Sequence, residues 1–272
     1  MADVRIGIAG AAGRMGAALV RETSATAGCR LVAACERAGS LAVGRDVGDL
    51  AGLGALGVAV TDSAEGVFRA AEVVIDFTAP QATAVHAELA ARHGVALVVG
   101  TTGLAASHEA VLQGASRKVG VVRAANFSIG VNLLLALTER VAATLGPDYD
   151  AEIVEMHHRH KKDAPSGTAL ALGEAVAEGR KIPLAEHAVR GRDGITGERP
   201  VGAIGFASLR GGDVVGDHTV IFAADGERLE LTHKASHRRI FAKGAVRAAL
   251  WIKGRPPGLY SMRDVIALAA GA

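Results

Sequence analysis

The sequence predicts an α/β protein in two parts: a parallel sheet flanked by helices, followed by a smaller α+β domain with a mixed or antiparallel sheet. Up to about residue 126, short runs rich in Val, Ile and Leu alternate with helical segments. Strands that alternate with helices pair in parallel, and continuous apolar runs are typical of strands buried on both faces. Beyond Asn126 this alternation ends, and strands separated by turns follow a long helix.

The first part opens with a strand, a glycine-rich turn and a helix. Its apolar runs predict strands at 4–9, 30–35, 73–76, 95–99 and 119–123. Helices are expected at 15–24, 80–93 and 105–118, with a glycine-rich loop at about 38–56.

The second part has a different order of helices and strands. It is expected to contain a helix at 130–145, a strand at 151–156, a polar stretch at 157–168 and a helix at 168–179. Residues 185–235 predict antiparallel strands at 201–209, 218–223 and 228–232, with a hairpin turn at Asp225-Gly226. A last helix at 241–252 precedes Pro256-Pro257 and a short terminal helix.

Composition excludes several classes of protein. Half of the 272 residues are apolar, the formal net charge is +2, and no long basic block is present. Nucleic acid is therefore not an expected partner. The first apolar segment, from Val4, is already a strand, and the apolar runs are far shorter than a membrane span, so neither a signal peptide nor a membrane contact is expected. The two cysteines, Cys29 and Cys35, fit reduced core thiols, and the cytoplasm is the expected compartment.

A glycine motif follows the first strand. Gly10, Gly13 and Gly16 open the first helix with the spacing GxxGxxG. Glycines let the backbone turn tightly and approach a pyrophosphate, and the start of a helix supplies free N–H groups and a partial positive charge. The order of strand, glycine turn and helix predicts a Rossmann-type dinucleotide site. Glycines at the start of a helix can also serve packing alone.

An acidic residue ends the second strand. Glu36 is placed to accept hydrogen bonds from the ribose diol of an adenosine, whereas its neighbour Arg37 can meet a 2′-phosphate. The pair predicts that both NADH and NADPH bind. The competing interpretation is an ion pair at the surface.

Three polar clusters follow Val-rich strands directly. They are Asp76-Phe77-Thr78, Gly100-Thr101-Thr102-Gly103 and Ala124-Ala125-Asn126-Phe127. Ligands of open α/β sheets bind beyond the carboxyl ends of the strands, so the three clusters together predict the floor of a nicotinamide pocket. Each one alone could be an ordinary turn.

The stretch from 152 to 169 concentrates chemically active side chains. His157 or His158 can donate a proton near neutral pH, and Lys161 adds a positive charge. Ser166, Gly167 and Thr168 offer hydroxyls and N–H groups at the start of a helix, which suits a carboxylate.

Three other interpretations apply to this stretch. His158 and His160 could hold a metal, but the neighbouring cations disfavour it. The stretch could be a solvated basic loop. Ser166 as a hydrolase nucleophile is disfavoured because it is not in a GxSxG elbow.

Residues 157–169, HHRHKKDAPSGTA, closely resemble the signature of the bacterial 4-hydroxy-tetrahydrodipicolinate reductases, also called dihydrodipicolinate reductases, of lysine biosynthesis. Supporting matches run along nearly the whole chain: AGAAGRMG at 9–16, IDFT at 75–78, VGTTG at 99–103, AANFS at 124–128 and LELTHKAS at 229–236. His237 and Arg239 differ from the family pattern, with no evident meaning.

The resemblance implies a reaction and a set of roles. The reaction is hydride transfer from NAD(P)H to a cyclic imine dicarboxylate, with loss of water, giving tetrahydrodipicolinate. His157 would donate the proton, with Lys161 as its cationic partner. Substrate carboxylates would be bound by His158, Ser166, Gly167, Thr168 and Thr102. The cofactor would be held by Gly10, Ala11, Ala12, Gly13, Arg14, Met15, Glu36, Arg37, Gly100, Thr101, Thr102, Ala124, Ala125, Asn126 and Phe127.

The resemblance also implies a domain division and an assembly. Residues 1–127 and 240–272 would form the dinucleotide-binding domain, and 128–239 the substrate-binding and oligomerisation domain. The family is typically a homotetramer assembled through the sheets of its second domain. Two rival functions stay open: a Rossmann-type dehydrogenase of the homoserine kind, and a non-catalytic nucleotide sensor. The cluster of His157 and Lys161 disfavours the sensor, which has no use for a proton donor beside an anion site.

Overall fold

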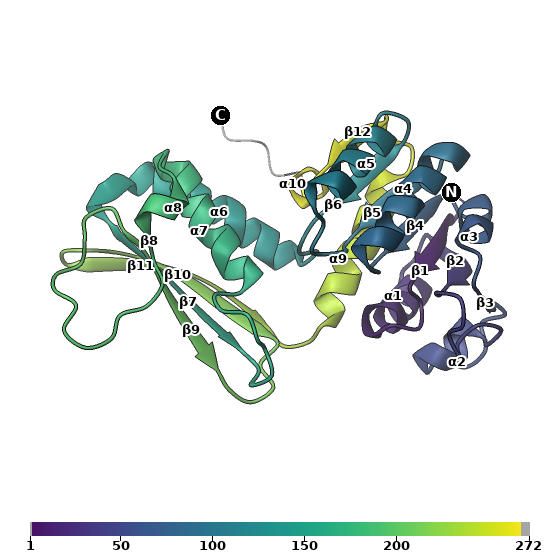
Figure 1. The fold of residues 1–272 in the computed structure, drawn as a ribbon, viewed down its shortest axis with the longest axis horizontal. Helices are drawn as coiled ribbons and strands as arrows, with labels where there is room; N and C mark the ends of the chain where they lie inside the picture. Colours follow the sequence, from purple (N-terminus) through teal and green to yellow (C-terminus); the bar gives the residue numbers. More distant parts are fainter. Residues whose placement is uncertain (1, 268–272) are drawn as a thin grey trace. The chain divides into compact units, whose positions relative to one another are not determined.

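The computed structural model describes residues 2–267 (Figure 1). Residue 1 and residues 268–272, which the expected dinucleotide-binding domain includes, lie outside the described residues. The chain divides into two compact units. Within the described residues, the first unit joins those up to Ile129 with Arg239–Ala267, and the second unit is Gly130–Arg238.

The described part of the first unit is built on a seven-stranded parallel sheet in the order β12-β6-β5-β4-β1-β2-β3. Its strands are β1 (Val4–Ala9), β2 (Cys29–Cys35), β3 (Val60–Thr61), β4 (Val73–Asp76), β5 (Ala96–Val99), β6 (Gly120–Arg123) and β12 (Gly258–Tyr260). The order reverses between β1 and β4, as in doubly wound sheets. The predicted Rossmann-type fold is confirmed.

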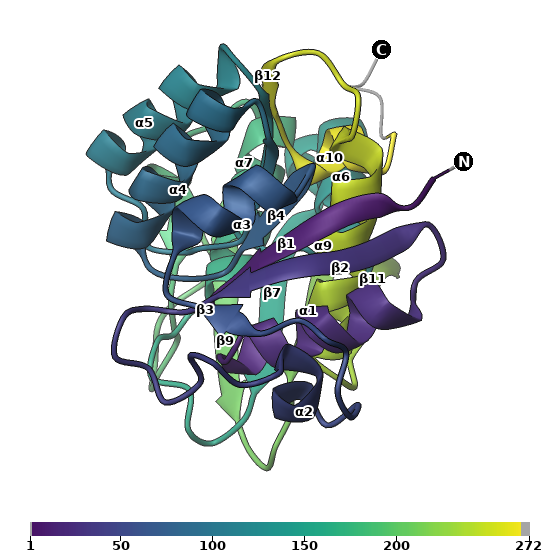
Figure 2. The ribbon, with the colours of Figure 1, turned by 90° about the vertical axis from the view of Figure 1, so that its right-hand side faces the viewer.

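Helices cover both faces of this sheet (Figure 2). They are α1 (Arg14–Ala25), α2 (Val47–Ala51), α3 (Ala64–Ala70), α4 (Pro80–His93), α5 (Ala106–Ser116), α9 (Arg239–Ile252) and α10 (Met262–Val265). Ile6 and Ile8 face the core shared with α1 and α9, whereas Ala9 and Val74 face the core shared with α3, α4 and α5. Burial on both faces explains why these strands are continuous apolar runs.

Four short elements of the first unit were not expected: α2, α3, β3 and β12. The predicted loop at 38–56 contains α2, which begins because the Asp46 carboxylate accepts a hydrogen bond of 2.7 Å from the N–H of Gly48. Ser63 caps α3 in the same way. Elements of two to seven residues are too short to show a period in the sequence, so only such capping residues could have revealed them.

The second unit contains a five-stranded sheet, within the described residues, in the order β11-β10-β7-β9-β8. The strands are β7 (Asp150–His157), β8 (Ala188–Val189), β9 (Ile204–Arg210), β10 (Gly216–Ala224) and β11 (Glu227–Ala235). The helices are α6 (Ile129–Leu145), a 3-10 turn (Gly146–Asp148), α7 (Gly167–Arg180) and α8 (Leu184–His187).

The expectation that residues 185–235 form antiparallel strands was wrong for β8 and β9. Both run parallel to β7, whereas β10 and β11 are antiparallel, so the sheet is mixed. The reason is the connection: the chain leaves β7, crosses through α7 and α8, and returns in the same direction. A crossover of that length joins parallel strands, whereas the tight turn between β10 and β11 joins antiparallel ones.

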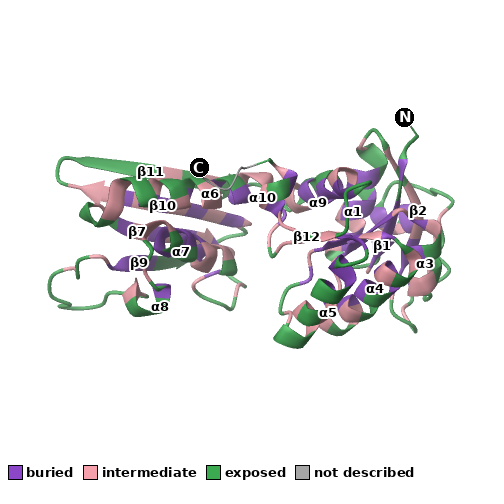
Figure 3. Cartoon of the chain, turned by 90° about the horizontal axis from the view of Figure 1, so that it is seen from above, coloured by how far each residue is buried: buried purple, intermediate pink, exposed green. Residues whose placement is uncertain are grey.

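The core of the second unit lies between its sheet and the helices α6 and α7. Alternate residues of β7, namely Ala151, Ile153, Glu155 and His157, are buried (Figure 3). Two of these are ionisable side chains, which stand in line with the apolar core residues of the same strand.

Helix α6 is strongly apolar for a helix of a globular unit. With the 3-10 turn it forms a stretch, Ile129–Asp148, that is long and apolar enough to cross a membrane by length and composition. Leu134 and Ala142 on one side of the helix lie in the core of the second unit, and Leu133 and Leu137 on another are 41% and 44% exposed. A core helix of a globular unit passes the same test, so the composition of α6 is weak evidence for a membrane.

Candidate active site

The glycine loop after β1 is held tightly at its base. Gly10 has a φ of +74°, which favours glycine, and its N–H donates to the Cys35 carbonyl over 2.9 Å. A Cβ at Gly16 would overlap the Gly10 carbonyl oxygen, so the close approach of loop and helix requires glycine there as well. Helix α1 begins after Gly13 without a capping side chain. The first turn of α1 therefore keeps the character of an anion site.

Glu36 lies beside this loop. Its carboxylate accepts hydrogen bonds from the N–H of Ala12, at 3.2 Å, and from the N–H of Arg37, at 3.1 Å. These contacts are with backbone groups and not with the exposed Arg37 guanidinium. The acid that the sequence predicted for the ribose is thus next to the loop that it predicted for the pyrophosphate.

The three polar clusters lie at the carboxyl ends of adjacent strands, β4, β5 and β6. The Thr78 N–H donates to the Thr101 hydroxyl over 3.1 Å, which links the first two clusters. The Phe77 and Phe127 rings lie 5.4 Å apart, which links the first to the third. A Cβ at Gly100 would overlap the Phe77 ring, so this packing depends on glycine.

Beneath the clusters is a buried polar network that sequence reasoning did not find. Asp76 has no exposed surface and lies 3.0 Å from the His86 Nδ1. The Thr83 hydroxyl donates to the Thr101 hydroxyl over 2.8 Å. The helical position of His86 gave no hint of this contact, because ten residues separate it from Asp76.

A dinucleotide fits this edge of the first unit. Glycine at Gly16 lets the loop lie close against the start of α1, and that uncapped helix start offers N–H donors to the charge of a phosphate. Glu36 offers carboxylate oxygens beside the same loop. Thr102 and Ala125 are exposed at the strand ends, where the nicotinamide pocket was predicted.

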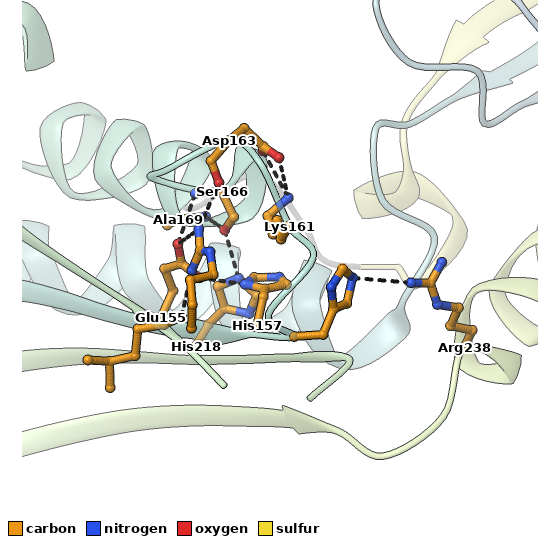
Figure 4. Close-up of polar contacts among 11 residues, drawn as sticks. Glu155, His157, Lys161, Asp163, Ser166, Ala169, His218 and Arg238 are labelled. Carbon is orange, nitrogen blue, oxygen red and sulfur yellow. Dashed lines mark hydrogen bonds and ion pairs between the residues drawn. The ribbon is translucent and has the colours of Figure 1, made fainter. Parts of the chain in front are cut away.

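The second unit contains a buried cluster of ionisable residues centred on His157 (Figure 4). Glu155 is 1% exposed and His157 is 9% exposed, and both lie on the helix-facing side of β7. The His157 Nδ1 is hydrogen-bonded to the Glu155 carboxylate. A histidine held at Nδ1 has Nε2 left for exchange of a proton with another molecule.

Arg210 binds Glu155 from the neighbouring strand. Its two terminal nitrogens donate to the two Glu155 oxygens at 2.9 and 2.8 Å. The N–H of Ser166 donates to the same carboxylate at 3.3 Å. Burial would raise the pKa of Glu155, but the hydrogen bonds from Arg210 and His157 outweigh it, so the pKa lies below its ordinary value. Glu155 is therefore a buried anion at neutral pH.

His218 faces His157 from β10. The two rings lie 5.1 Å apart, edge to face, and the His218 Nε2 is 3.1 Å from the Ser166 hydroxyl. Burial, and then the charge of His157, lowers the pKa of His218 to about 4. His218 is therefore neutral at physiological pH.

Ser166 begins helix α7. Its hydroxyl accepts a hydrogen bond of 3.1 Å from the Ala169 N–H, which caps the helix, and Ser166 is 2% exposed. Gly167, in the first turn, is exposed, and Thr168 is half-buried. At this helix start, where the sequence predicted an anion site, the Ser166 hydroxyl is therefore already hydrogen-bonded to groups of the protein itself.

The segment after β7 carries the remaining predicted residues. The Lys161 ammonium binds both oxygens of Asp163 at 2.8 Å. The His158 Nε2 lies 3.5 Å from the Arg238 guanidinium, and burial together with Arg238 lowers the pKa of His158. Among residues 2–267, no group of three or more His, Cys, Asp or Glu is placed to hold a metal.

Sequence reasoning missed Glu155, Arg210 and His218. The signal was the alternation on β7: Glu155 and His157 are two residues apart, so they share a face with Ile153. Register then places His218 opposite Glu155 and Arg210 opposite His157. Neither pairing can be known before the strand order is known.

Comparisons with known proteins point to one and the same family for both parts of the chain. A family model described as "Dihydrodipicolinate reductase, N-terminus" matches residues 4–127, and one described as "Dihydrodipicolinate reductase, C-terminus" matches residues 130–266. A 4-hydroxy-tetrahydrodipicolinate reductase from Beijerinckia indica is 55% identical over 268 residues, 98% of this chain and 99% of that one. One from Rhizobium meliloti is 56% identical over 267 residues, 98% of each chain.

Solved structures give the same result. A dipicolinate-bound dihydrodipicolinate reductase from Paenisporosarcina superposes with a TM-score of 0.77 at 25% identity, covering 97% of this chain and 99% of that one. Family models that match both units, and relatives more than half identical over almost the full length, leave a single conclusion. The chain belongs to the dihydrodipicolinate reductase family, a family of NAD(P)H-dependent oxidoreductases.

Proposed function

We propose that this chain reduces 4-hydroxy-tetrahydrodipicolinate to tetrahydrodipicolinate, in lysine biosynthesis, and that the cluster around His157 carries out the proton transfer. The observation that carries the proposal is a buried His157 held at Nδ1 by an ionised Glu155. The same carboxylate accepts a hydrogen bond from the Ser166 N–H at the start of helix α7. Bound NADH or NADPH supplies the hydride. Each turnover consumes that hydride and one proton, and releases one water.

His157 supplies the proton from Nε2. Glu155 occupies the Nδ1 side of the ring, so Nε2 is the nitrogen that can face the substrate. A positioned imidazole that exchanges a proton near neutral pH is suited to general acid catalysis. His218 cannot take this role, because its low pKa keeps it neutral and its Nε2 is occupied by Ser166.

The start of helix α7 binds the substrate carboxylates. Gly167 and Thr168 present the first turn of the helix, where backbone N–H groups and the helix dipole favour an anion. Ser166 shapes this site by capping the helix. His158 and Lys161 add polar and cationic groups, with Asp163 holding the Lys161 ammonium. Thr102, exposed at the end of β5, is a further proposed ligand.

Both reduced cofactors are accepted. The loop Gly10–Met15 and the strand ends 100–102 and 124–127 bind the dinucleotide. Glu36 accepts hydrogen bonds from a free ribose diol, and Arg37, exposed beside it, pairs with a 2′-phosphate.

The active form is a cytoplasmic homotetramer assembled through the second unit. Helices α6 and α7 cover one face of its sheet, and the other face carries Val154, Met156, Leu209 and Ile221. Leu209 is 50% exposed there, which suits a contact between copies. Light scattering should give the mass of four chains, and Leu209→Glu should give a smaller species. A wild-type mass of one chain would refute the assembly.

A coupled assay tests the function. The cyclic imine is made in situ, the absorbance of NADH or NADPH is followed, and the product is identified, which separates this reaction from that of a homoserine-type dehydrogenase. His157→Gln should lower kcat by roughly 10²-fold or more with little change in cofactor affinity. His160→Gln, at an exposed position in the same segment, is the matched control. If neither cofactor is oxidised by the wild type, as expected of a nucleotide sensor, the function is wrong; if His157→Gln stays within a few-fold, His157 is not the acid.

A further inference from the structure

We infer that Glu155 is a positioning residue: its carboxylate, clamped by Arg210, fixes the ring of His157 with one proton on Nδ1 and stabilises the doubly protonated ring before proton transfer. The inference deepens the proposed function and rests on it, because it assigns the group that prepares His157 for the reaction. The alternation on β7 places Glu155 on the same face as His157, but it does not by itself assign Glu155 this role.

The first step of the argument is that Glu155 is held from several sides. Arg210 binds it through both carboxylate oxygens, and the N–H of Ser166 donates to one of them. Arg210 is itself anchored, because it donates to the Asp163 carbonyl over 2.7 Å. A bidentate arginine pair has a fixed geometry. The oxygen that receives the His157 Nδ1 is therefore rigid.

The second step concerns the opposite side of the ring. A Cβ on Gly216 would lie 2.9 Å from the His157 Nε2. Glycine at this position keeps the space beside Nε2 open, while Glu155 fixes the other ring nitrogen. The ring is thus oriented by one neighbour and left accessible by another.

The third step concerns the charged groups around His157. Glu155 on β7 is the anion in contact with it. Arg210 on β9 is a cation, but it is bound to Glu155, and His218 on β10 is neutral. In the segment that follows, His158 is a weaker base than usual and Lys161 is paired with Asp163. An imidazolium at His157 therefore depends on the Glu155 charge for its stability.

Glu155→Gln keeps the shape and removes that charge. The Arg210 cation is then unbalanced beside His157, and the ring loses its partner for the charged form. We expect kcat to fall on the order of 10²-fold, with a much smaller change in KM. The alkaline limb of the kcat profile should move to lower pH, because a neighbouring carboxylate favours the charged form of a ring that it is hydrogen-bonded to. Loss of a merely structural contact would not move this limb.

Glu152→Gln is the matched control. Glu152 lies on the same strand but on the opposite face, and it too is bound by a bidentate arginine, Arg192, at 2.9 Å for both contacts. Arg199 also donates to Glu152 at 2.9 Å, so this variant removes an arginine-bound carboxylate charge from the same strand without touching His157. Its pH profile should match that of the wild type.

A second measurement does not depend on the folding of a variant. In the wild-type protein with ¹⁵N-labelled histidine, at a pH where the His157 ring is neutral, the ring should carry its proton on Nδ1, and Nε2 should be unprotonated. A proton found on Nε2 instead would overturn the inference, as would an unmoved pH limb in folded Glu155→Gln. Failure of the proposed function gives a different result: the wild type would then oxidise neither cofactor with the cyclic imine, whatever the ¹⁵N shifts show.

Discussion

Acid should destabilise the protein through His218. This side chain is 4% exposed, and burial together with the charge of His157 lowers its pKa from 6.5 to about 4. The unfolded chain has the ordinary value, so between these two pH values the unfolded state binds a proton that the folded state does not. Stability is therefore complete above pH 6.5 and is lost as the pH falls toward 4.

The size of the effect follows from the two pKa values. A gap from 6.5 to about 4 corresponds to a total of about 3 kcal/mol, of which about 2 kcal/mol is lost by pH 5. Other groups titrate in the same range, so the useful quantity is the difference between the wild type and His218→Gln. Urea unfolding at fixed protein concentration gives the free energy of unfolding of each protein at pH 7.5 and at pH 5. On going from pH 7.5 to pH 5, the wild type should lose about 2 kcal/mol more of this free energy than the variant does.

The control is His160→Gln, at an exposed position of the same unit. Its stability relative to the wild type should be the same at both pH values. If His218→Gln behaves in the same way as this control, within a few tenths of a kcal/mol, then His218 is not a buried neutral base and the reasoning fails.

Three further predictions concern the two binding sites and the proton donor. Gly216→Ala should lower kcat about 10-fold or more at little cost in KM, because its Cβ would press on the His157 Nε2; unchanged steady-state kinetics would contradict this. Glu36→Ala should weaken NADH more than NADPH, and Arg37→Ala the reverse, each by about 1–2 kcal/mol in fluorescence titrations; parallel losses of both cofactors would count against it. Thr168→Val should cost about 1–3 kcal/mol in kcat/KM and weaken a pyridine dicarboxylate inhibitor in parallel. Calorimetry that finds the inhibitor equally tight would place the anion site elsewhere.

The first unit could be predicted closely because its signals are local. The motif of Gly10, Gly13 and Gly16, the acid at Glu36 and the polar ends of β4, β5 and β6 each stand next to an apolar run. Where an element is only two to seven residues long, as in β3 or α3, the chain is too short to show a period. Capping by Asp46 or Ser63 was the available signal.

The candidate site of the second unit was predicted in part, for a physical reason. His157 and Lys161 lie in one segment, whereas Glu155 acquires its meaning from Arg210, fifty-five residues later in the chain. That contact needs β9 to run parallel to β7, which the sequence did not reveal. A glutamate and an arginine on strands usually face water, so nothing local marked them as a buried pair.

The division of the first unit between two stretches of chain has a consequence for the order of folding. Helix α9 buries Ala242, Val246 and Ala249 in the core that it shares with α1, and its Arg239 binds the nearly buried Glu22 over 2.7 Å. During synthesis, the part of this sheet face that α9 covers stays without its helix until the whole second unit has been made. We expect the second unit, which is continuous in the chain, to fold first. Its folding then brings α9 close to a sheet whose strands were mostly synthesised long before it.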